Sequence, residues 1–334
     1  MRRLIKIAIV LGLLWSGVWL AGSLVLKRGI EGWFATQAAR GWQAEYAAIT
    51  GSGYPLRHMT LIDTPALADP GSGAAWRADW LLLDSPAIWP GHQRLQFPAT
   101  DQRLSFFDRT TVIRAEDMQA RLDLRLGRAL TLDRLELTAA AWQSDQPDGD
   151  RFGADDLILS MRQEGAPESY RLSLAARGFT PGRRLRLGAL AGGSGLPGTF
   201  DALSAEAQLR FDRPWDRRAL EDRRPQPRAI VLDDADIHWG PLRLQARGAV
   251  DIDPAGRPGG EIALRAENWR EMLMLAEQAG VIPAETAAPL RRVLELLAGT
   301  GDDSDTLDTQ LRFADGRMSL GPLPLGPAPQ ITLR

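Results

Sequence analysis

The amino-acid sequence predicts a mainly β protein, with an N-terminal transmembrane helix, a long antiparallel meander and a C-terminal helical hairpin. Three observations lead to this prediction. Residues 7–26 form an uncharged apolar run, short segments of alternating polar and apolar residues fill most of the remaining chain, and the period changes to about 3.6 residues within 268–298. The alternation fits either a curved sheet with a groove or a sandwich.

The N-terminal apolar run is long enough to span a bilayer. As a helix it measures about 30 Å, the thickness of the hydrocarbon core, whereas the apolar part of a cleaved leader is usually about 7–15 residues long. Arg2, Arg3 and Lys6 precede the run, and Lys27 and Arg28 follow it, which places the N-terminus in the cytoplasm. We expect residues 1–28 to be a retained signal anchor in a bacterial inner membrane, crossed once, with the rest of the chain in the periplasm.

The anchor is expected to continue into a juxtamembrane amphipathic helix at residues 29–44. Trp33, Phe34 and Trp42 are interpreted as interfacial aromatics, because such residues gather where a span leaves the bilayer; a partner-binding role is the alternative. Next, residues 51–55 read Gly-Ser-Gly-Tyr-Pro between two strand-like runs, which predicts a β-hairpin.

The rest of the chain is expected to divide into a first antiparallel β region at 45–213, a charged flexible loop at 214–227 and a second β region at 228–334. The loop is rich in arginine, acid and proline, a composition that buries little apolar surface. The predicted strands after the hairpin are 78–84, 94–97, 103–107, 118–126, 130–138, 156–163, 170–176, 205–211, 228–239, 242–252, 260–266, 306–313 and 317–320.

The helical hairpin is predicted within 268–298 of the second β region. Asn268 suits an N-cap and Gly280 a C′ position, and a second helix over 284–298 ends at Gly299. The apolar stripe must be buried on a neighbouring sheet face, so the pair is expected to be a lid over the sheet. The lid residues are Trp269, Leu273, Leu294 and Leu297.

The composition excludes several function classes. The 334 residues carry 40 basic and 42 acidic side chains, a formal charge of −2, so there is no global field that attracts nucleic acid. Cysteine is absent, which excludes disulfides, a thiol nucleophile and thiolate metal sites. Lysine occurs only at Lys6 and Lys27, so the exported part has no lysine chemistry.

The motifs that could carry chemistry are incomplete. The three histidines have no companion at metal-ligand spacing, and the Gly-x-Gly-x-x-Gly match at 193–198 contains Pro197 where a dinucleotide site needs a helix. Two acidic clusters are also present. One is interpreted as a solvated loop, and the other as an exposed strand edge on which Asp234 and Asp236 point to the side opposite Asp233. The histidines are His58, His92 and His238, and the loop cluster is Asp302, Asp303, Asp305 and Asp308. We therefore predict no catalytic residue, no metal and no cofactor, and no enzyme.

Several short segments resemble a known bacterial family. They are Gly41-Trp42, the turn at 53–57, the segments at 64–67 and 238–242, and the closing stretches 315–317 and 320–325. Together they resemble domain-of-unknown-function family 2125, over essentially the whole chain. The family looks distantly like the AsmA-like envelope proteins, whose curled β-sheets accommodate lipid beyond a single N-terminal anchor. The resemblance implies a membrane-anchored envelope protein and brings no catalytic residue.

Two hypotheses of function follow. The first is a periplasmic β protein that binds lipid or another amphiphile on an apolar sheet surface, with the bilayer as its other partner. The alternative is a structural or partner-binding envelope module, in which the same surface is a closed core without a ligand. They differ in whether the apolar side chains of the strands form an open groove or a filled core.

Overall fold

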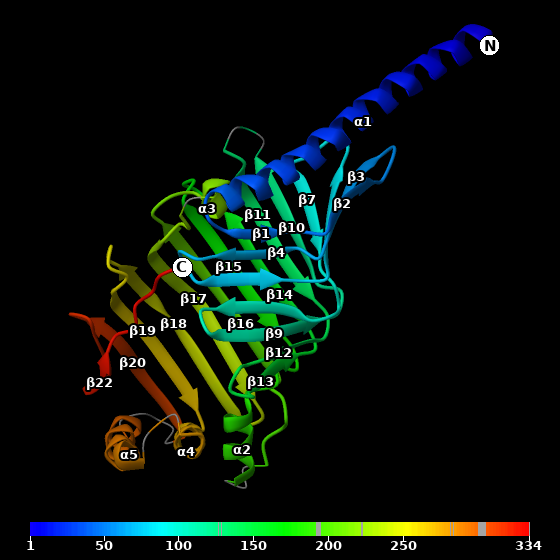
Figure 1. Ribbon diagram of the computed structural model, residues 1–334. Coiled ribbons are helices and arrows are strands. Elements are labelled where there is room, and N and C mark those ends of the chain that lie inside the picture. The colour runs from blue at the N-terminus through cyan, green and yellow to red at the C-terminus, as the bar shows by residue number, and fades with distance from the viewer. Residues whose placement is uncertain are drawn as a thin grey trace. The chain divides into compact units, whose positions relative to one another are not determined.

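The chain is mainly β and begins with one long apolar helix (Figure 1). The computed structural model describes residues 1–125, 127, 129–191, 195–221, 223–280, 282, 284–299 and 305–333. It comprises two compact units, Met1–Leu137 and Thr138–Arg334, called unit 1 and unit 2. Both contain antiparallel strands that mostly follow one another along the chain, so the predicted meander is confirmed. The finer five-part division stays a prediction.

In unit 1 the apolar run and most of the amphipathic segment after it form a single helix, α1 (Arg2–Ala39). The helix ends before the predicted residue 44, because Gln43 and Ala44 belong to strand β1 (Gln43–Glu45). The side chains from Leu4 to Leu14 are mostly exposed, and α1 is long and apolar enough to cross a membrane, a property that signal sequences share. The other end of α1 packs on the β part of unit 1. Phe34 is buried there against Ile49 and Ile62.

The strands of unit 1 belong to two sheets. One has the order β1-β4-β5-β8-β9 and the other the order β2-β3-β6-β7-β10-β11. Strands β2 and β3 form the predicted hairpin, with Ser52 opposite Met59. The short strands β4, β5 and β9 were not predicted. The strands are β1 (Gln43–Glu45), β2 (Ala48–Ser52), β3 (Arg57–Asp63), β4 (Ala66–Asp69), β5 (Ala74–Arg77), β6 (Trp80–Pro86), β7 (His92–Gln96), β8 (Gln102–Phe106), β9 (Arg109–Ala115), β10 (Gln119–Arg125) and β11 (Thr131–Ala139), which ends in unit 2.

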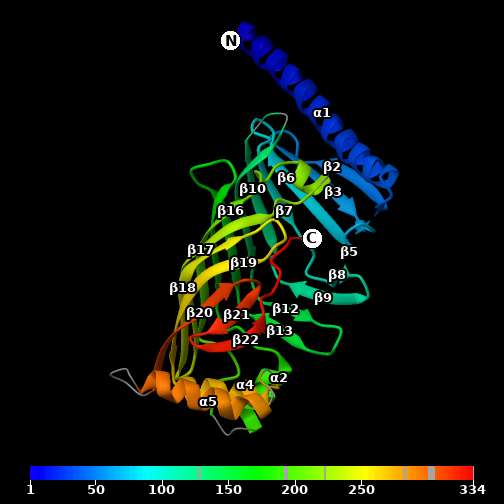
Figure 2. The same cartoon turned by 90° about the vertical axis from the view of Figure 1, so that its left-hand side faces the viewer.

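Unit 2 contains a β12-β13 pair and a sheet in which β14 to β22 follow in sequence order. Figure 2 shows the long strands β17, β18 and β19 side by side in this sheet. The strands are β12 (Trp142–Asp145), β13 (Arg151–Ala154), β14 (Leu157–Gln163), β15 (Ser169–Ala176), β16 (Ala202–Phe211), β17 (Pro227–Trp239), β18 (Leu242–Ile252), β19 (Pro258–Glu267), β20 (Thr306–Ala314), β21 (Arg317–Leu320) and β22 (Leu323–Pro327).

Unit 2 also contains four helices in its described part. They are α2 (Arg183–Ala191), α3 (Arg218–Glu221), α4 (Trp269–Gln278) and α5 (Ala284–Ala298). The short helices α4 and α5 occupy the predicted positions, whereas α2 and α3 were not predicted. Asn268 precedes α4 but makes no side-chain cap. Its backbone is left-handed, with φ +58°, and its side-chain amide donates to the carbonyl oxygen of Pro241 instead.

Gly260 is a position in this sheet where only glycine fits. Its φ is +140°, and a Cβ there lies 2.3 Å from the carbonyl oxygen of Ala249 and 3.0 Å from the Cα of Val250. Both are backbone atoms of β18, so they cannot rotate away. We expect Gly260→Ala to lower the free energy of unfolding of unit 2 by about 1–3 kcal/mol. A Cβ on Gly259 meets nothing within 4 Å, so Gly259→Ala is the control, and equal melting temperatures of the two variants contradict the expectation.

Candidate functional site

One face of the sheet in unit 2 is apolar across seven strands, β14 to β20. In an antiparallel sheet, directly opposite residues point to the same side, so the register shows which side chains form a row. One row crosses all seven strands and consists of Leu159, Leu174, Ala205, Ala235, Ala246, Leu264 and Thr309. The next row consists of Met161, Leu172, Ala207, Leu232, Gly248, Ile262 and Leu311. We call the surface formed by these two rows the apolar face.

Much of the apolar face is accessible to solvent. All the members of the first row, and most of the second, are partly exposed; Met161 and Ala207 are buried. At about 4.8 Å per strand, seven strands make the face about 29 Å wide. Alanine or glycine occupies the middle strands β16, β17 and β18, except at Leu232 of β17, and larger leucines stand on either side. The apolar face is thus a broad surface with small side chains near its centre, and unit 2 leaves it partly exposed.

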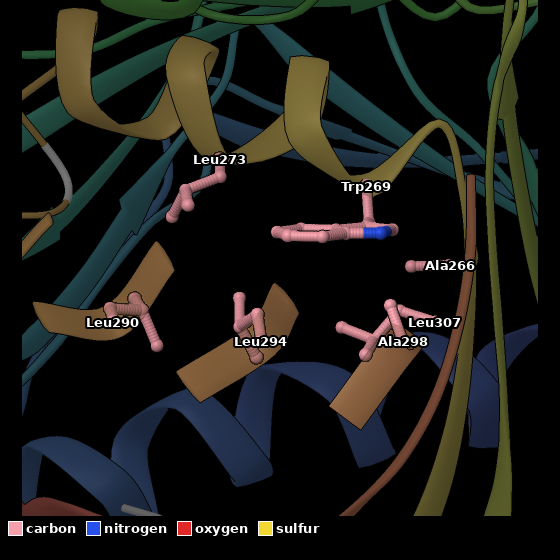
Figure 3. Packing of buried hydrophobic residues seen from close by; sticks show 7 residues of the cluster. All are labelled: Ala266, Trp269, Leu273, Leu290, Leu294, Ala298 and Leu307. Carbon is pink, nitrogen blue, oxygen red and sulfur yellow. The ribbon is translucent and has the colours of Figure 1, made fainter. Parts of the chain in front are cut away.

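Helices close one end of the apolar face. Figure 1 shows α2, α4 and α5 gathered at the same end of the sheet. Figure 3 shows that α4 and α5 direct their apolar side chains toward each other and toward β19 and β20; the cluster is Ala266, Trp269, Leu273, Leu290, Leu294, Ala298 and Leu307. A second cluster at this end joins Leu275 of α4 to Phe200, Trp239 and Leu242. The helices are therefore buried against the end of the sheet, beside the two rows.

Aromatic residues close the opposite end. Tyr170 is 1% exposed, and its ring packs edge-on against Phe211, with 5.8 Å between the ring centroids. The hydroxyl oxygen of Tyr170 accepts a hydrogen bond from the backbone N–H of Trp215 at 3.0 Å, and Phe211 packs edge-on against Trp215 as well. Buried clusters thus delimit the apolar face at the helical end and, over β15 and β16, at the opposite end.

The other face of the same sheet is polar and carries cross-strand ion pairs. Arg243 donates to both carboxylate oxygens of Asp236, at 3.0 and 2.8 Å, and these hydrogen bonds hold the pKa of Asp236 below its usual range. A hollow of about 780 Å³ on this side is lined mainly by polar residues such as Gln245, Arg247 and Gln310. The contrast between the faces makes an amphipathic sheet.

The acidic cluster on β17 belongs to this polar face, and the predicted strand edge was wrong. Strand β17 is hydrogen-bonded to β16 on one side and to β18 on the other, so it is not an edge. The predicted alternation was wrong too, because a bulge between Leu232 and Ala235 places consecutive acids on one side. The pairs are Asp233 with Arg171, Asp234 with Arg247 and Asp236 with Arg243.

The structure brings together three of the four predicted lid residues. Trp269, Leu273 and Leu294 lie in the buried cluster between α4, α5 and the sheet, and the side chain of Leu297 lies outside the described residues. Their role as a lid stays a prediction.

The aromatics predicted at the membrane interface lie at the end of α1 next to the strands. Phe34 is 4% exposed within the core of unit 1, Trp33 packs beside it, and Trp42 follows the helix. The charged residues Arg2, Arg3, Lys6, Lys27 and Arg28 all lie on α1. Lys27 is 3.8 Å from Glu31 in an i, i+4 pair.

The histidines lie apart from one another. His58 is buried, stacks on Trp19 with ring centroids 5.3 Å apart, and has its pKa lowered by burial. The Nδ1 atom of His92 is 2.5 Å from a carboxylate oxygen of Asp123, and His238 is exposed on β17. Within the described ranges, no three His, Asp or Glu side chains are grouped so that they could hold a metal ion.

Two sequence motifs fall partly outside the described residues. Gly193 and Ser194 of the glycine-rich match are not described, whereas the carbonyl oxygen of Pro197 accepts the indole N–H of Trp239 at 2.8 Å. Asp302 and Asp303 of the acidic loop are not described either. The other two members form ion pairs, Asp305 with Arg270 and Asp308 with Arg265.

Comparison with known proteins gives a family. The family model described as "Uncharacterized protein conserved in bacteria (DUF2125)" matches residues 19–329, nearly the whole chain. The chain belongs to this family. No curated protein matches it.

For this DUF2125 protein, sequence reasoning predicted the strands and an apolar sheet surface, but not which side chains align to form it. The leucines of β14, β15 and β20 signal alternation, whereas Ala205, Ala235 and Ala246 in the middle carry a weak apolar signal. Cross-strand register, which aligns them in one row, depends on contacts distant in sequence and has no local signal.

Proposed function

We propose that this DUF2125 protein is a single-pass protein of the bacterial inner membrane whose periplasmic β part binds a lipid or another amphiphile on the apolar face. The apolar run of α1, with Arg2, Arg3 and Lys6 ahead of it, supports a retained anchor with its N-terminus in the cytoplasm. The resemblance to AsmA-like envelope proteins favours the same class of ligand.

One observation carries the proposal: two registered rows of apolar side chains stay partly exposed between closed ends. A filled core leaves no such rows. Soluble proteins rarely expose a large contiguous apolar surface without a function, so the exposed rows favour a binding role. Each methylene of an acyl chain buried on such a surface contributes about 0.8 kcal/mol. Several methylenes laid across β15 to β19 therefore contribute several kcal/mol toward binding.

The shape of the surface favours a flexible chain as the ligand. Ala205, Ala235 and Ala246 leave space above the middle strands beside Leu232, while larger residues stand on both sides. We propose that α4 and α5, the pair expected to form a hairpin, serve as a lid at one end of the apolar face. The proposed role is binding and not catalysis, since the polar side chains of the sheet lie on its other face in arginine–carboxylate pairs.

Two tryptophan substitutions on one strand test the proposal. Ala205→Trp places a bulky side chain at the centre of the apolar face, and Ser204→Trp places the same side chain on the polar face of β16. The full chain is purified in lipid discs and examined by native mass spectrometry after release. We expect bound amphiphile on the unmodified chain and on Ser204→Trp, and loss of it on Ala205→Trp.

Lipid that is held only around α1 is present in equal amount in all three proteins. The quantity that tests the proposal is therefore the difference in bound amphiphile between the two variants. Circular dichroism and melting confirm that both variants fold. Equal amphiphile content in the two folded variants contradicts binding on the apolar face. That outcome favours the alternative, an envelope module that uses this surface for a protein partner or for packing.

A further inference from the structure

The loops at one end of unit 1 expose four large apolar side chains next to α1. They lie on the turn 53–56, between β2 and β3, and on the loop 87–91, between β6 and β7. The exposed fractions are 56% for Tyr54, 70% for Leu56, 76% for Ile88 and 54% for Trp89. The backbone N–H of Ala87 donates to the carbonyl oxygen of Leu56 at 2.9 Å, so the two loops form one surface. We call them the apical loops.

The apical loops are attached to the part of α1 that belongs to the apolar run. The indole N–H of Trp15 donates to the carbonyl oxygen of Pro55 at 3.0 Å, and that of Trp19 donates to the carbonyl oxygen of Arg57 at 2.8 Å. Figure 1 shows β2 and β3 ending close to α1. The helix therefore passes the turn 53–56 before it leaves its apolar stretch.

The part of α1 that precedes its first contact with the turn is too short to span the bilayer by itself, so lipid must extend further along the helix. The uncharged run begins at Ile7, so residues 7–14 precede the first contact with the turn and measure about 12 Å as a helix, at ~1.5 Å per residue. The hydrocarbon core is about 30 Å thick, so lipid must cover about twelve more residues, 15–26. These residues include Trp15 and Trp19, which bond the turn. A bilayer that covers α1 fully therefore also covers the turn.

Several polar groups in and beside the turn have partners, which lowers the cost of placing them in lipid. Besides the two carbonyl oxygens bonded by tryptophan, the hydroxyl of Tyr54 is 2.7 Å from that of Ser16, and the guanidinium of Arg57 contacts both carboxylate oxygens of Asp84 at 2.6 and 2.7 Å. Unpaired polar groups cost several kcal/mol in hydrocarbon. The apical loops thus present apolar side chains outward and pair several of their polar groups.

We propose that the apical loops insert into the exoplasmic leaflet of the membrane beside α1. Insertion buries Leu56, Ile88 and the ring of Tyr54, whose hydroxyl pairs with Ser16, in lipid, and it places Trp89 near the interface, where such rings are favoured. It also holds unit 1 against the membrane, so the protein is attached by α1 and two loops together and not by α1 alone. The proposal rests on α1 being retained as the membrane anchor.

Site-directed spin labelling tests the insertion, and the absence of cysteine means that no native thiol has to be removed. Leu56→Cys and Ile88→Cys are labelled in the full chain in proteoliposomes. Leu11→Cys on α1 is the lipid reference. Leu104→Cys, an exposed apolar position on β8, is the water reference. Relative collision with oxygen and with a water-soluble nickel complex measures the environment of each label.

We expect labels at Leu56 and Ile88 to collide with oxygen several-fold more than with nickel, as at Leu11, and the label at Leu104 to show the reverse. A lipid-like Leu11 with water-like Leu56 and Ile88 overturns loop insertion and leaves the anchor intact. A water-like Leu11 overturns the retained anchor and with it the proposal.

Discussion

Leu294→Asp is expected to unfold unit 2, whereas Leu296→Asp, on the same helix, is expected to leave it folded. Leu294 is 5% exposed in the cluster around Trp269, and Leu296 is 75% exposed. Removing a buried leucine side chain costs about 2–5 kcal/mol, and a carboxyl group in its place adds the cost of desolvation. Because domains are stable by only about 5–15 kcal/mol, we expect loss of a cooperative transition.

Thermal unfolding of the full chain, followed by tryptophan fluorescence, measures this difference. Leu296→Asp controls for the introduced charge and for helix propensity. A cooperative transition for Leu294→Asp, at the temperature of the control, contradicts the buried position of α5 and places the helix in solvent.

Tyr170→Ala is expected to be the most damaging change at the opposite end of the apolar face. The ring is buried against Phe211, and truncation of a large buried aromatic typically costs about 3–5 kcal/mol. It also removes the acceptor of the Trp215 N–H. Tyr170→Phe keeps the ring and loses only the hydroxyl, for which we expect about 1 kcal/mol.

The graded series separates packing from hydrogen bonding. Chemical denaturation of the full chain, read as the denaturant midpoint of unit 2, places the variants in the order unmodified, Tyr170→Phe, Tyr170→Ala. Equal loss in the two variants assigns the effect to the hydroxyl and contradicts the packing account.

The main strands and two of the helices were predictable because their signals are local. Alternation over β15 to β19 and the 3.6-residue stripe of α4 and α5 come from residues adjacent in the chain. Helix α2 carries a run of arginines instead of an apolar stripe, and β4 and β5 have four residues each, too few to show a period.

The sequence predicted an apolar sheet surface but not the residues that form it, and it did not predict the apical loops, because both surfaces depend on contacts between distant residues. The row through Ala205, Ala235 and Ala246 exists only because β16, β17 and β18 align in one register, with a bulge in β17 that maintains it. The apical loops are placed beside α1 by hydrogen bonds from Trp15 and Trp19 to residues about 40 positions away in the sequence. Sequence reasoning interpreted that stretch only as a span.

Photolabelling with a diazirine-bearing fatty acid tests amphiphile binding on the apolar face most directly. The full chain in lipid discs is irradiated, digested and mapped by mass spectrometry. Labels on the exposed apolar residues of α1 are the internal reference for lipid contact. The account predicts additional labels on β14 to β20 at apolar-face residues such as Leu174 and Leu264. Labels on α1 with none on these strands contradict it.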